Sequence, residues 1–367
     1  MQLAHNFLFM RTRKLPHLAV LTAALAIELT QLPGAHAAPA PTAPTVHTVK
    51  PGQSIQAAVK AARPGDTIQL RAGVYRENVL ITKSRLTLRG VGRTTVLTAP
   101  AKASANACGK AGHGVCVTGT AQHPVSNVRI RSLTVSGFPK NGIWGSRTVR
   151  MDVRDTLAEK NGQQGIGQEL STRGAFLRNV SRNNKESGIF LANTVDAEGG
   201  ATDAKGTRVA GNRLSGNRIG VVVRRLRNLT VEQNTATGNC GGVFVVGDES
   251  KPRAGDLTVA HNAVHANNAY CAPNARLPFI QGAGIVLTGT EGTRVTGNQV
   301  HNNVGTSPMS GGIVLFKSVV GIANTKNAIS RNVLTGNKPA DVADRDKGPG
   351  NTFTGNVCTL SVPTGRC

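Results

Sequence analysis

The stretch from Thr207 to Val245 most constrains what this chain can fold into, because it repeats itself once. In each copy, alternating apolar residues lead to an Asn, a second Asn follows five residues later, and a Gly then opens a run of β-branched residues. Asn212 recurs as Asn234 and Asn217 as Asn239, a step of 22 residues. A unit that short cannot bury its own apolar face, so it predicts one coil of a stacked solenoid.

The same Gly-apolar pair recurs along most of the chain and predicts the other coils. Successive pairs are 23, 23, 32, 22, 42 and 28 residues apart, and they begin at Gly142, Gly165, Gly188, Gly220, Gly242, Gly284 and Gly312. Spacings near 22 indicate bare coils, and the longer ones predict insertions near residues 196–206, 248–255 and 269–281. Insertions in solenoids commonly gather on one side and form the binding face.

The first 37 residues have the pattern of a signal peptide. Three basic residues precede the apolar run 18–27, and Ala35–Ala37 has the small-x-small pattern of a cleavage site. That run is too short to span a bilayer, and no later segment is apolar enough to do so. We therefore expect a secreted, extracellular chain without a membrane span, in which residues 38–48 form a Pro/Ala-rich linker.

The chain is strongly basic. It has 43 Lys and Arg against 19 Asp and Glu, a formal net charge of +24, which attracts polyanions. For a secreted chain the expected partner is an acidic polysaccharide or an anionic cell-wall polymer, and nucleic acid is disfavoured. The 43 Gly and the 3% of aromatic residues favour many short strands joined by tight turns.

The six cysteines of an exported chain predict disulfides, although six allow fifteen pairings. Proximity in sequence favours Cys108–Cys116 and Cys358–Cys367, the second closing a C-terminal tail over residues 358–367. This leaves Cys240–Cys271, which would tie the insertion 269–281 to a neighbouring coil. A metal site is the alternative, but the CxxC and CxH spacings typical of such sites do not occur.

Residues 49–97 predict an N-terminal cap followed by the first coils. Ser54 is a good helix cap, and Ile55 and Val59 share one apolar face before residues 63–66 end the helix. Short strands are expected at 67–70, 79–81, 86–88 and 96–97. A solenoid has an open apolar end, and a short amphipathic helix would cover it.

The run PGQSIQAAV…PGDTIQLRAGVYRENV resembles the N-terminal cap of secreted right-handed parallel β-helix proteins of the pectate-lyase-like superfamily. The later N-x(4)-N…G-I-x-V coils resemble the generic repeat of that fold. The resemblance covers about residues 46–357. It implies an all-β, right-handed parallel β-helix with a short N-terminal capping helix and with coils over 98–357. It selects no reaction, because the fold carries lyases, hydrolases, epimerases, esterases and non-enzymes.

Alternation within each Gly-I-x-V strand predicts which side chains face the core and which form an outer stripe. The stripe is mostly apolar and comprises Trp144, Phe190, Val222, Phe244, Val286, Val314 and Phe316. One interpretation is that inserted loops, the C-terminal tail or a second subunit cover it, which leaves an oligomer open. The others are a sugar-stacking platform and a wrong strand phase. The recurring Asn residues predict structural ladders rather than a site.

As a platform, the stripe would place Trp144 and Phe190 under pyranose rings. Glu169, at an outward position between them in sequence, and Lys317, after the last such strand, are the other predicted substrate-binding residues. Arg224 and Arg225 would hold substrate carboxylates. They are also the predicted catalytic residues, because they follow a strand whose neighbours are apolar at that point.

The resemblance implies β-elimination of a uronate polymer as the leading reaction. That reaction needs the carboxylate neutralised by Ca²⁺ or Arg, and a base for the proton α to it. No cofactor is certain. Ca²⁺ would need clustered carboxylates, for which Asp152 and Asp155 are weak candidates. Further base candidates are Lys160, His265, His301 and Lys317.

Whether the chain is an enzyme stays open at this stage. Hydrolases of this fold use Asp residues on adjacent coils, which this sequence does not supply, so a lyase or an epimerase is favoured over a hydrolase. The alternative is a non-catalytic cell-wall or glycan-binding protein. A metal-maturation role resembling that of the copper-insertion β-helix proteins would need Met or His clusters, and only four Met occur, two of them in the leader.

Overall fold

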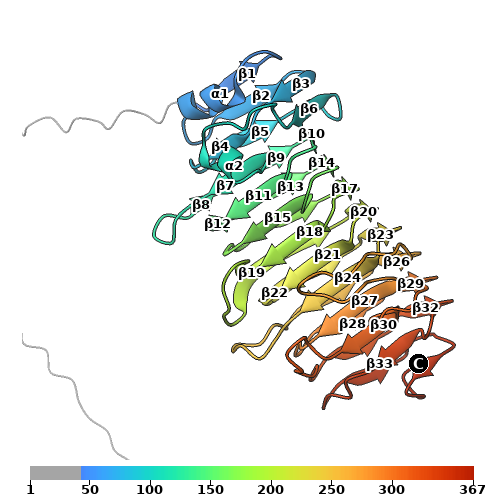
Figure 1. Cartoon of the computed structure of the whole chain (residues 1–367). Coiled ribbons are helices and arrows are strands. Elements are labelled where there is room, and N and C mark those ends of the chain that lie inside the picture. Colours follow the sequence, from blue (N-terminus) through green and yellow to red (C-terminus); the bar gives the residue numbers. More distant parts are fainter. Residues whose placement is uncertain (1–42) are drawn as a thin grey trace, which may run out of the picture. The chain divides into compact units, whose positions relative to one another are not determined.

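The computed structural model describes residues 43–367, so the predicted signal peptide and the start of the predicted linker lie outside the described residues. Almost all strands belong to three long parallel sheets, here called A, B and C (Figure 1). The chain passes from C to A to B in each coil, and each coil adds one strand to each sheet over most of the length. This is the right-handed parallel β-helix that the sequence predicts.

The strands are short, and each sheet is built in order along the stack. Sheet A comprises β1 Val46–Val49, β2 Thr67–Leu70, β5 Thr87–Arg89, β9 Arg129–Arg131, β13 Asp152–Arg154, β16 Ala175–Leu177, β19 Thr202–Ala210, β22 Leu226–Glu232, β25 Thr258–Ala260, β28 Arg294–Thr296, β31 Ala328–Ser330 and β34 Thr352–Thr354. Sheet B comprises β3 Gly73–Arg76, β6 Thr95–Thr98, β10 Thr134–Ser136, β14 Leu157–Glu159, β17 Val180–Arg182, β20 Arg213–Ser215, β23 Thr235–Thr237, β26 Ala263–His265, β29 Gln299–His301 and β32 Val333–Thr335. Sheet C comprises β4 Val79–Ile81, β7 Val115–Thr118, β11 Ile143–Ser146, β15 Ile166–Glu169, β18 Ser187–Ala192, β21 Ile219–Arg224, β24 Gly241–Val246, β27 Ala283–Thr288, β30 Gly311–Phe316, β33 Val342–Asp344 and β35 Ser361–Val362. Outside these sheets lie the helices α1 Ile55–Ala61 and α2 Ala107–Lys110, and the pair β8 Val125–Ser126 with β12 Thr148–Val149.

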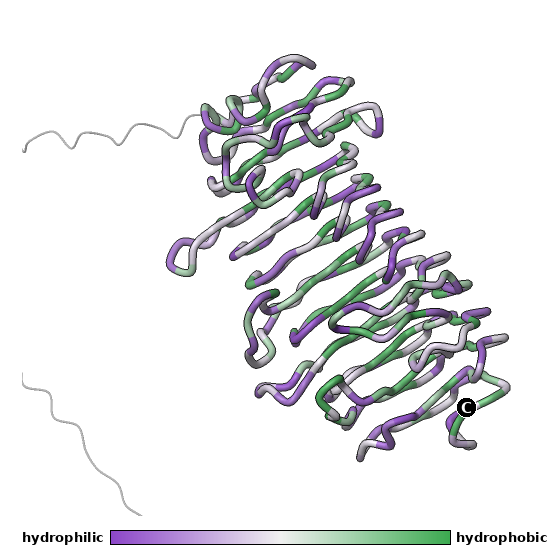
Figure 2. The backbone as a smooth tube through the Cα atoms, viewed as in Figure 1, coloured by the Kyte–Doolittle hydropathy of each residue, from purple (hydrophilic) through white to green (hydrophobic). Residues whose placement is uncertain are grey.

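The core lies between the three sheets and is filled by the inward residues of every coil. In sheet C the inward pairs are fully buried, as the alternation predicts: Ile189 and Leu191, Val221 and Val223, Val243 and Val245, Ile285 and Leu287, Ile313 and Leu315. Parallel in-register pairing places these residues above one another along the stack. Figure 2 shows apolar residues along the strands and hydrophilic residues at many of the turns.

The N-terminal cap is confirmed. The Ser54 hydroxyl accepts a hydrogen bond from the Ala57 N–H at 3.0 Å, and the Glu77 carboxylate accepts one from the Ile55 N–H at 2.8 Å, so the first turn of α1 is satisfied. Ile55 and Val59 are buried against the first coils. None of the helices within 43–367 has the length and apolar character that a bilayer span requires.

Three predicted boundaries differ from the structure. The linker predicted to end at residue 48 is wrong at its end, since β1 begins at Val46 and pairs with β2. That pairing provides hydrogen-bond partners for the edge of β2 in sheet A. In addition, His47 Nε2 lies 2.8 Å from an Asp66 carboxylate oxygen. The strand expected at 86–88 is Thr87–Arg89, and the insertion expected at 196–206 already contains the start of β19.

The predicted Asn ladders are confirmed as structural devices. Asn212, Asn234 and Asn262 are buried in one ladder, in which each side-chain amide donates to the side-chain oxygen of the next Asn at 2.8–3.0 Å. Each backbone N–H donates to the same oxygen, at 2.9 and 3.0 Å. A second ladder runs through Asn217 and Asn239 in the same way. The ladders satisfy turn backbone that is cut off from water.

All three predicted disulfides are present: Cys108–Cys116, Cys240–Cys271 and Cys358–Cys367. Cys240 directly precedes β24, so its bond fixes the insertion 269–281 beside sheet C. The third bond closes the C-terminal tail, in which β35 adds the last strand to sheet C.

Candidate functional site

The outer face of sheet C carries the predicted apolar stripe, and the chain itself covers the C-terminal half of that stripe. Four stripe residues are buried in one cluster with Ile280 of the insertion 269–281 and with Met309: Val222, Phe244, Val286 and Val314. Cover by an inserted loop is therefore confirmed here, and the strand phase is right. The prediction of an oligomer formed through these four positions is wrong, because their side chains are already buried within the chain.

The N-terminal half of the same face is built from aromatic rings. The indole of Trp144 stacks on the imidazole of His113, with ring centroids 5.9 Å apart, and on the Phe190 ring at 6.4 Å. Gly167 lies between the last two in the strand order, and a Cβ there would approach the Trp144 ring to 2.6 Å. The stack therefore depends on a glycine at that position.

This stacking changes the role predicted for Trp144. A pyranose stacks on an open ring face, but the faces of Trp144 are turned to His113 and Phe190, and the residue is 9% exposed. The sugar-stacking platform predicted at Trp144 is therefore wrong. Ring edges carry partial positive charge. The faces of Trp144 are covered by its stacking neighbours, so the stack presents ring edges to a ligand. Ring edges suit the oxygen atoms of a ligand better than its apolar faces.

His113 is held as a neutral imidazole. Its Nδ1 accepts a hydrogen bond from the Asn141 N–H at 3.2 Å, so the remaining proton belongs on Nε2. Burial, reinforced by the charge of Lys140, lowers the pKa of His113 to about 4. At neutral pH this side chain is therefore a hydrogen-bond donor rather than a cation.

This pKa predicts a loss of stability in mild acid. The unfolded chain takes up a proton near pH 6.5, whereas the folded chain resists it until about pH 4, so the stabilisation is complete above 6.5 and is lost as pH falls through that window. We expect the free energy of unfolding to drop by roughly 3 kcal/mol across the window. Urea unfolding at pH 7 and pH 4 measures it. His113→Gln should remove most of this drop, and His123→Gln, at an exposed histidine, should not; equal profiles would contradict the assignment.

A cationic rim borders the ring stack at β21. Arg224 is half-buried at the end of β21, and its Nη2 donates to the carbonyls of Thr194 and Val195 at 3.1 Å each. Its Nε is buried and makes no hydrogen bond within residues 43–367. Burial lowers the pKa of Arg224, and the charges of Arg225 and Arg276 lower it further. The carboxylates of Glu198 and Asp248 act in the opposite direction but do not outweigh the burial.

Arg276 is the site residue that the sequence analysis missed. It lies in the insertion 269–281, is exposed, and takes part in none of the ion pairs of the described residues. Arg218 holds the same insertion down by donating to the Ala272 carbonyl at 2.8 Å. The Cys240–Cys271 bond was the available signal, because it fixes this insertion beside β21 and β24.

Glu169 lies on the outer face of β15, between β11 and β18. Its carboxylate accepts hydrogen bonds from the Ser146 hydroxyl at 3.2 Å and from the Val195 N–H at 3.1 Å. Arg224 also contacts Val195, so both side chains are anchored to the same loop. We call the following residues the sheet C site: the ring stack of His113, Trp144 and Phe190, together with Glu169, Arg224 and Arg276.

Comparison with known proteins agrees with this architecture. Residues 195–359 match the family model described as the right handed beta helix region. The match covers less than half of the chain, and the three parallel sheets show that the chain folds as a right-handed parallel β-helix. No sequence relative was found among curated proteins.

Several solved structures share the fold of this β-helix protein. The A-module of mannuronan C-5 epimerase AlgE4 of Azotobacter vinelandii has a TM-score of 0.55 and 19% identity, and covers 83% of this chain and 92% of that chain. Pectate lyase Pel9A has a TM-score of 0.52 and 14% identity, covering 87% and 78%. DFA-IIIase from Arthrobacter chlorophenolicus A6 without its lid has a TM-score of 0.53 and 15% identity, and the match covers 81% of this chain and 88% of that chain. At these identities the similarity is one of fold.

Arg225 does not join the sheet C site of the β-helix protein. Its Nε pairs with Asp248 and its Nη2 with Glu198, while Nη1 donates to the Ala197 carbonyl at 3.1 Å. All three guanidinium nitrogens are thus engaged, and they tie the insertions 196–206 and 248–255 together. This geometry contradicts the catalytic role predicted for Arg225.

The weak metal candidates are ion-paired on sheet A. Asp152 pairs with Arg131 at 3.1 Å and with Arg154 at 2.5 Å, and Asp155 accepts two hydrogen bonds from Arg178 at 2.9 Å. Guanidinium groups occupy the oxygens that a cation would need, so the Ca²⁺ site predicted at Asp152 and Asp155 is wrong. Within 43–367 no three His, Cys, Asp or Glu side chains gather as a metal site.

The other predicted residues lie away from the ring stack. Lys317 follows β30, six strands from Trp144 in sheet C, a separation of roughly 29 Å at about 4.8 Å per strand. It therefore cannot hold a sugar that contacts Trp144. His265 and His301 stack on sheet B with ring centroids 4.8 Å apart, as their equivalent positions predict. Lys160 lies in the turn after β14.

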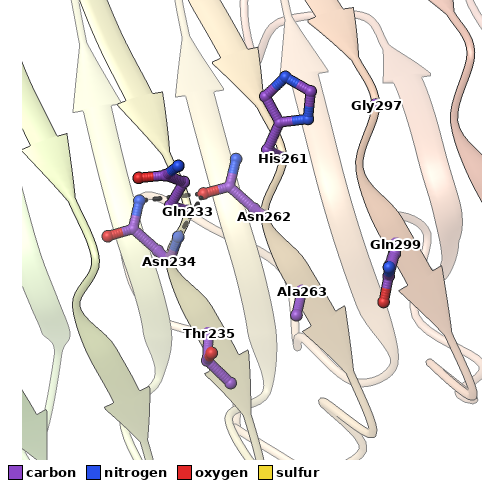
Figure 3. A pocket seen from close by; sticks show the side chains of 8 residues that line it. All are labelled: Gln233, Asn234, Thr235, His261, Asn262, Ala263, Gly297 and Gln299. Atoms are coloured by element: carbon purple, nitrogen blue, oxygen red, sulfur yellow. Dashed lines mark hydrogen bonds between the residues drawn. The ribbon is translucent and has the colours of Figure 1, made fainter.

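A separate hollow of about 340 Å³ lies along the turn between sheets A and B (Figure 3). Its wall includes Asn234 and Asn262, which are joined to each other by a ladder hydrogen bond of 3.0 Å. His261 stands at its edge with the Gln233 turn beside it (Figure 3). Because these amides are used by the ladder, the hollow is a groove of the turn and not a second candidate site.

Proposed function

We propose that this β-helix protein is secreted, binds an acidic polysaccharide at the sheet C site and removes a proton α to a uronate carboxylate. The observation that carries the proposal is the placement of two arginines: Arg224 ends β21, and Arg276 lies in the insertion that the Cys240–Cys271 bond holds beside β24, the neighbour of β21. The three disulfides support an oxidising, extracellular location.

The chemistry of the site suits an anionic, oxygen-rich ligand. Arg276 is exposed and able to form a bidentate pair with a carboxylate. The ring edges and the Nε2–H of His113 offer positive partial charge to hydroxyl oxygens. Epimerase and pectate lyase neighbours of the same fold carry names that refer to uronate polymers, which favours this substrate class.

In the proposed reaction Arg276 holds the carboxylate, and the deprotonated form of Arg224, which burial and the neighbouring arginines favour, takes the proton from C5 and becomes the cation. The electron pair left at C5 is delocalised into the carboxylate. If the C4–O bond then breaks, its electrons leave with the oxygen, which takes up a proton from water, and a C4–C5 double bond forms. If a proton instead returns from the opposite side, C5 is epimerised. The scheme as written uses the two arginines alone, and the comparison of calcium with chelator tests whether Ca²⁺ takes part.

Ultraviolet absorbance of the mature protein with pectate, alginate and glycosaminoglycans, each with calcium and with chelator, tests the reaction. A rising signal from the conjugated double bond that persists in chelator is the expected result for elimination. Proton exchange from solvent at C5 without a rise in absorbance indicates epimerisation. Neither absorbance nor exchange on any polymer would refute the catalytic part of the proposal.

Binding has its own prediction, because Trp144 is the single Trp of the chain. Oligouronate bound at the sheet C site should change the intrinsic fluorescence, since it replaces water at the edge of the ring stack. Titration gives a dissociation constant, and Arg276→Ala should weaken it by about tenfold, as expected for the loss of one charged contact. A neutral oligosaccharide serves as the control. An identical response to both ligands would contradict recognition of charge.

A non-catalytic glycan-binding protein is the second candidate. It is favoured by the engagement of Arg225 in loop contacts, which leaves Arg224 as the one predicted catalytic residue at the site. The fluorescence titration would then succeed while absorbance and proton exchange stay flat.

A further inference from the structure

The outer face of sheet A carries a second concentration of charge, separate from the sheet C site. Strands β5, β9, β13 and β16 are consecutive in this sheet, and their in-register pairing aligns outward side chains along the stack. Seven arginines gather on these strands and on the turns before them, against the single carboxylate of Asp152: Arg85, Arg89, Arg129, Arg131, Arg150, Arg154 and Arg173. We call this surface the sheet A arginine face.

Most of this charge is not used within the chain. Arg131 and Arg154 share Asp152. The other five are exposed, and none of them makes an ion pair within residues 43–367: Arg85, Arg89, Arg129, Arg150 and Arg173. Unpaired guanidinium groups held a few ångström apart repel one another, and a polyanion relieves that repulsion. The face is therefore complementary to a chain of negative charges.

The turn that carries three of these arginines does not need them. Arg85, Arg150 and Arg173 stand two residues before β5, β13 and β16 and have φ of 61°, 58° and 57°. Asn127 and Asn228 occupy the same turn position in other coils, with φ of 57° and 55°. Asn adopts this left-handed conformation more readily than Arg. Backbone geometry therefore does not account for arginine at this position.

The face is also hollowed where the charge is greatest. A depression of about 230 Å³ is lined by four arginines and one carboxylate, that of Asp152, together with Asn127, Met151 and Ala175; the arginines are Arg129, Arg150, Arg154 and Arg173. From β5 to β16 the array spans three strand spacings, roughly 14 Å at about 4.8 Å per strand. That length accommodates a few residues of an extended polymer rather than one small anion.

We propose that the sheet A arginine face binds an extended acidic polysaccharide and so holds the polymer at a second surface of the protein. The outward positions of β5, β9, β13 and β16 have no aromatic side chain, whereas single-stranded nucleic acid is usually held by base stacking on aromatic residues. The face is formed by short strands of one sheet and presents no helix or ribbon that could enter a duplex groove. The choice of polysaccharide rests in part on the function proposed for sheet C.

The test compares two triple variants with the same loss of charge. R129T/R150N/R173N removes three unpaired arginines, with replacements that other coils already use: Thr87 and Thr230 stand at the position of Arg129, and Asn127 and Asn228 at that of the other two. The control R294T/K326N/R331N alters exposed residues in the C-terminal half, at positions of the same kind. Full-length mature protein is passed over immobilised sodium alginate at several salt concentrations.

We expect R129T/R150N/R173N to bind alginate at least about tenfold more weakly at physiological salt, with a shallower salt dependence, and the control to bind as the wild type does. An equal loss in both variants, or in neither, overturns the proposal. Tighter binding of a poly(dT) oligonucleotide than of alginate, lost in the same variant, overturns the choice of polysaccharide.

Failure here is distinguishable from failure at sheet C. Fluorescence of Trp144 with a short oligouronate reports the sheet C site alone and should be unchanged in R129T/R150N/R173N. Arg276→Ala should weaken that titration while leaving the salt-dependent retention on alginate close to that of the wild type. If Arg276→Ala abolishes all retention, the sheet A arginine face contributes no binding of its own and the inference is overturned.

Discussion

Replacing Arg224 by alanine is expected to lower kcat/KM on the responsive uronate polymer by about 10²- to 10⁴-fold, the usual contribution of a positioned acid or base. The reason is its place at the sheet C site: it is half-buried, its pKa is lowered, and its Nε lacks a partner within residues 43–367. The measurement is the initial rate of double-bond absorbance, or of proton exchange if the reaction is epimerisation.

Arg224 also holds a loop, so the variant needs controls that separate chemistry from folding. Its Nη2 donates to Thr194 and Val195, and Arg224→Lys keeps a positive donor there while changing the pKa of the base. Arg224→Lys should therefore retain the Trp144 fluorescence response, lower kcat without abolishing it, and shift the pH profile of the remaining kcat. Arg213→Ala removes an exposed arginine on sheet B and should leave the rate unchanged. Wild-type turnover in Arg224→Ala would remove it from the mechanism.

Arg276→Ala should act differently, by raising KM more than it lowers kcat. Arg276 is exposed on an inserted loop and is assigned to holding the substrate carboxylate, a contact made before as well as during the reaction. A fall in kcat equal to that of Arg224→Ala would instead make the two arginines parts of one catalytic unit.

The repeated parts of this fold could be predicted from the sequence, because the same residue pattern recurs in each coil. Inward residues such as Val221 and Val243, the Asn ladders and the covered stripe follow from alternation and a period near 22 residues. Small irregularities were not accessible in this way. The pairing of β1 at Val46 lies outside the period, and Pro/Ala-rich composition alone indicated a linker.

The site was less predictable because it depends on insertions, which have no period. Which carboxylates meet Arg225 is decided by two loops that fold toward each other, bringing Glu198 and Asp248 to one guanidinium. One face of Trp144 is covered by His113. This residue lies before Gly142, where the recognised repeat begins, so the repeat pattern did not place it beside Trp144. Composition showed that positive charge is abundant, but only the strand register gathers seven arginines on sheet A.

Replacing Asn234 by alanine is expected to cost about 3–5 kcal/mol of unfolding free energy, a large effect for a single side chain. Asn234 is buried, and its Nδ2 donates to the Val209 carbonyl at 2.9 Å and to the Asn262 side chain at 3.0 Å. Its Oδ1 accepts from the backbone N–H and from the side-chain amide of Asn212, at 2.9 and 2.8 Å. Alanine leaves these groups buried without a partner, and desolvation penalties of about 1–3 kcal/mol each accumulate.

The urea midpoint of the mature, disulfide-bonded protein measures this effect. Gln299→Ala is the matched control: it also removes an amide side chain, but from an exposed position on β29. That change should stay within about 0.5 kcal/mol. Because each coil contacts mainly its neighbours, the damage in Asn234→Ala should be local, with faster amide exchange in the coils of Asn212 and Asn262 than at α1. A uniform rise in amide exchange along the solenoid would show that the ladder is coupled to global unfolding rather than to its own turn. An unchanged urea midpoint would mean that water replaces the ladder hydrogen bonds at no cost in stability.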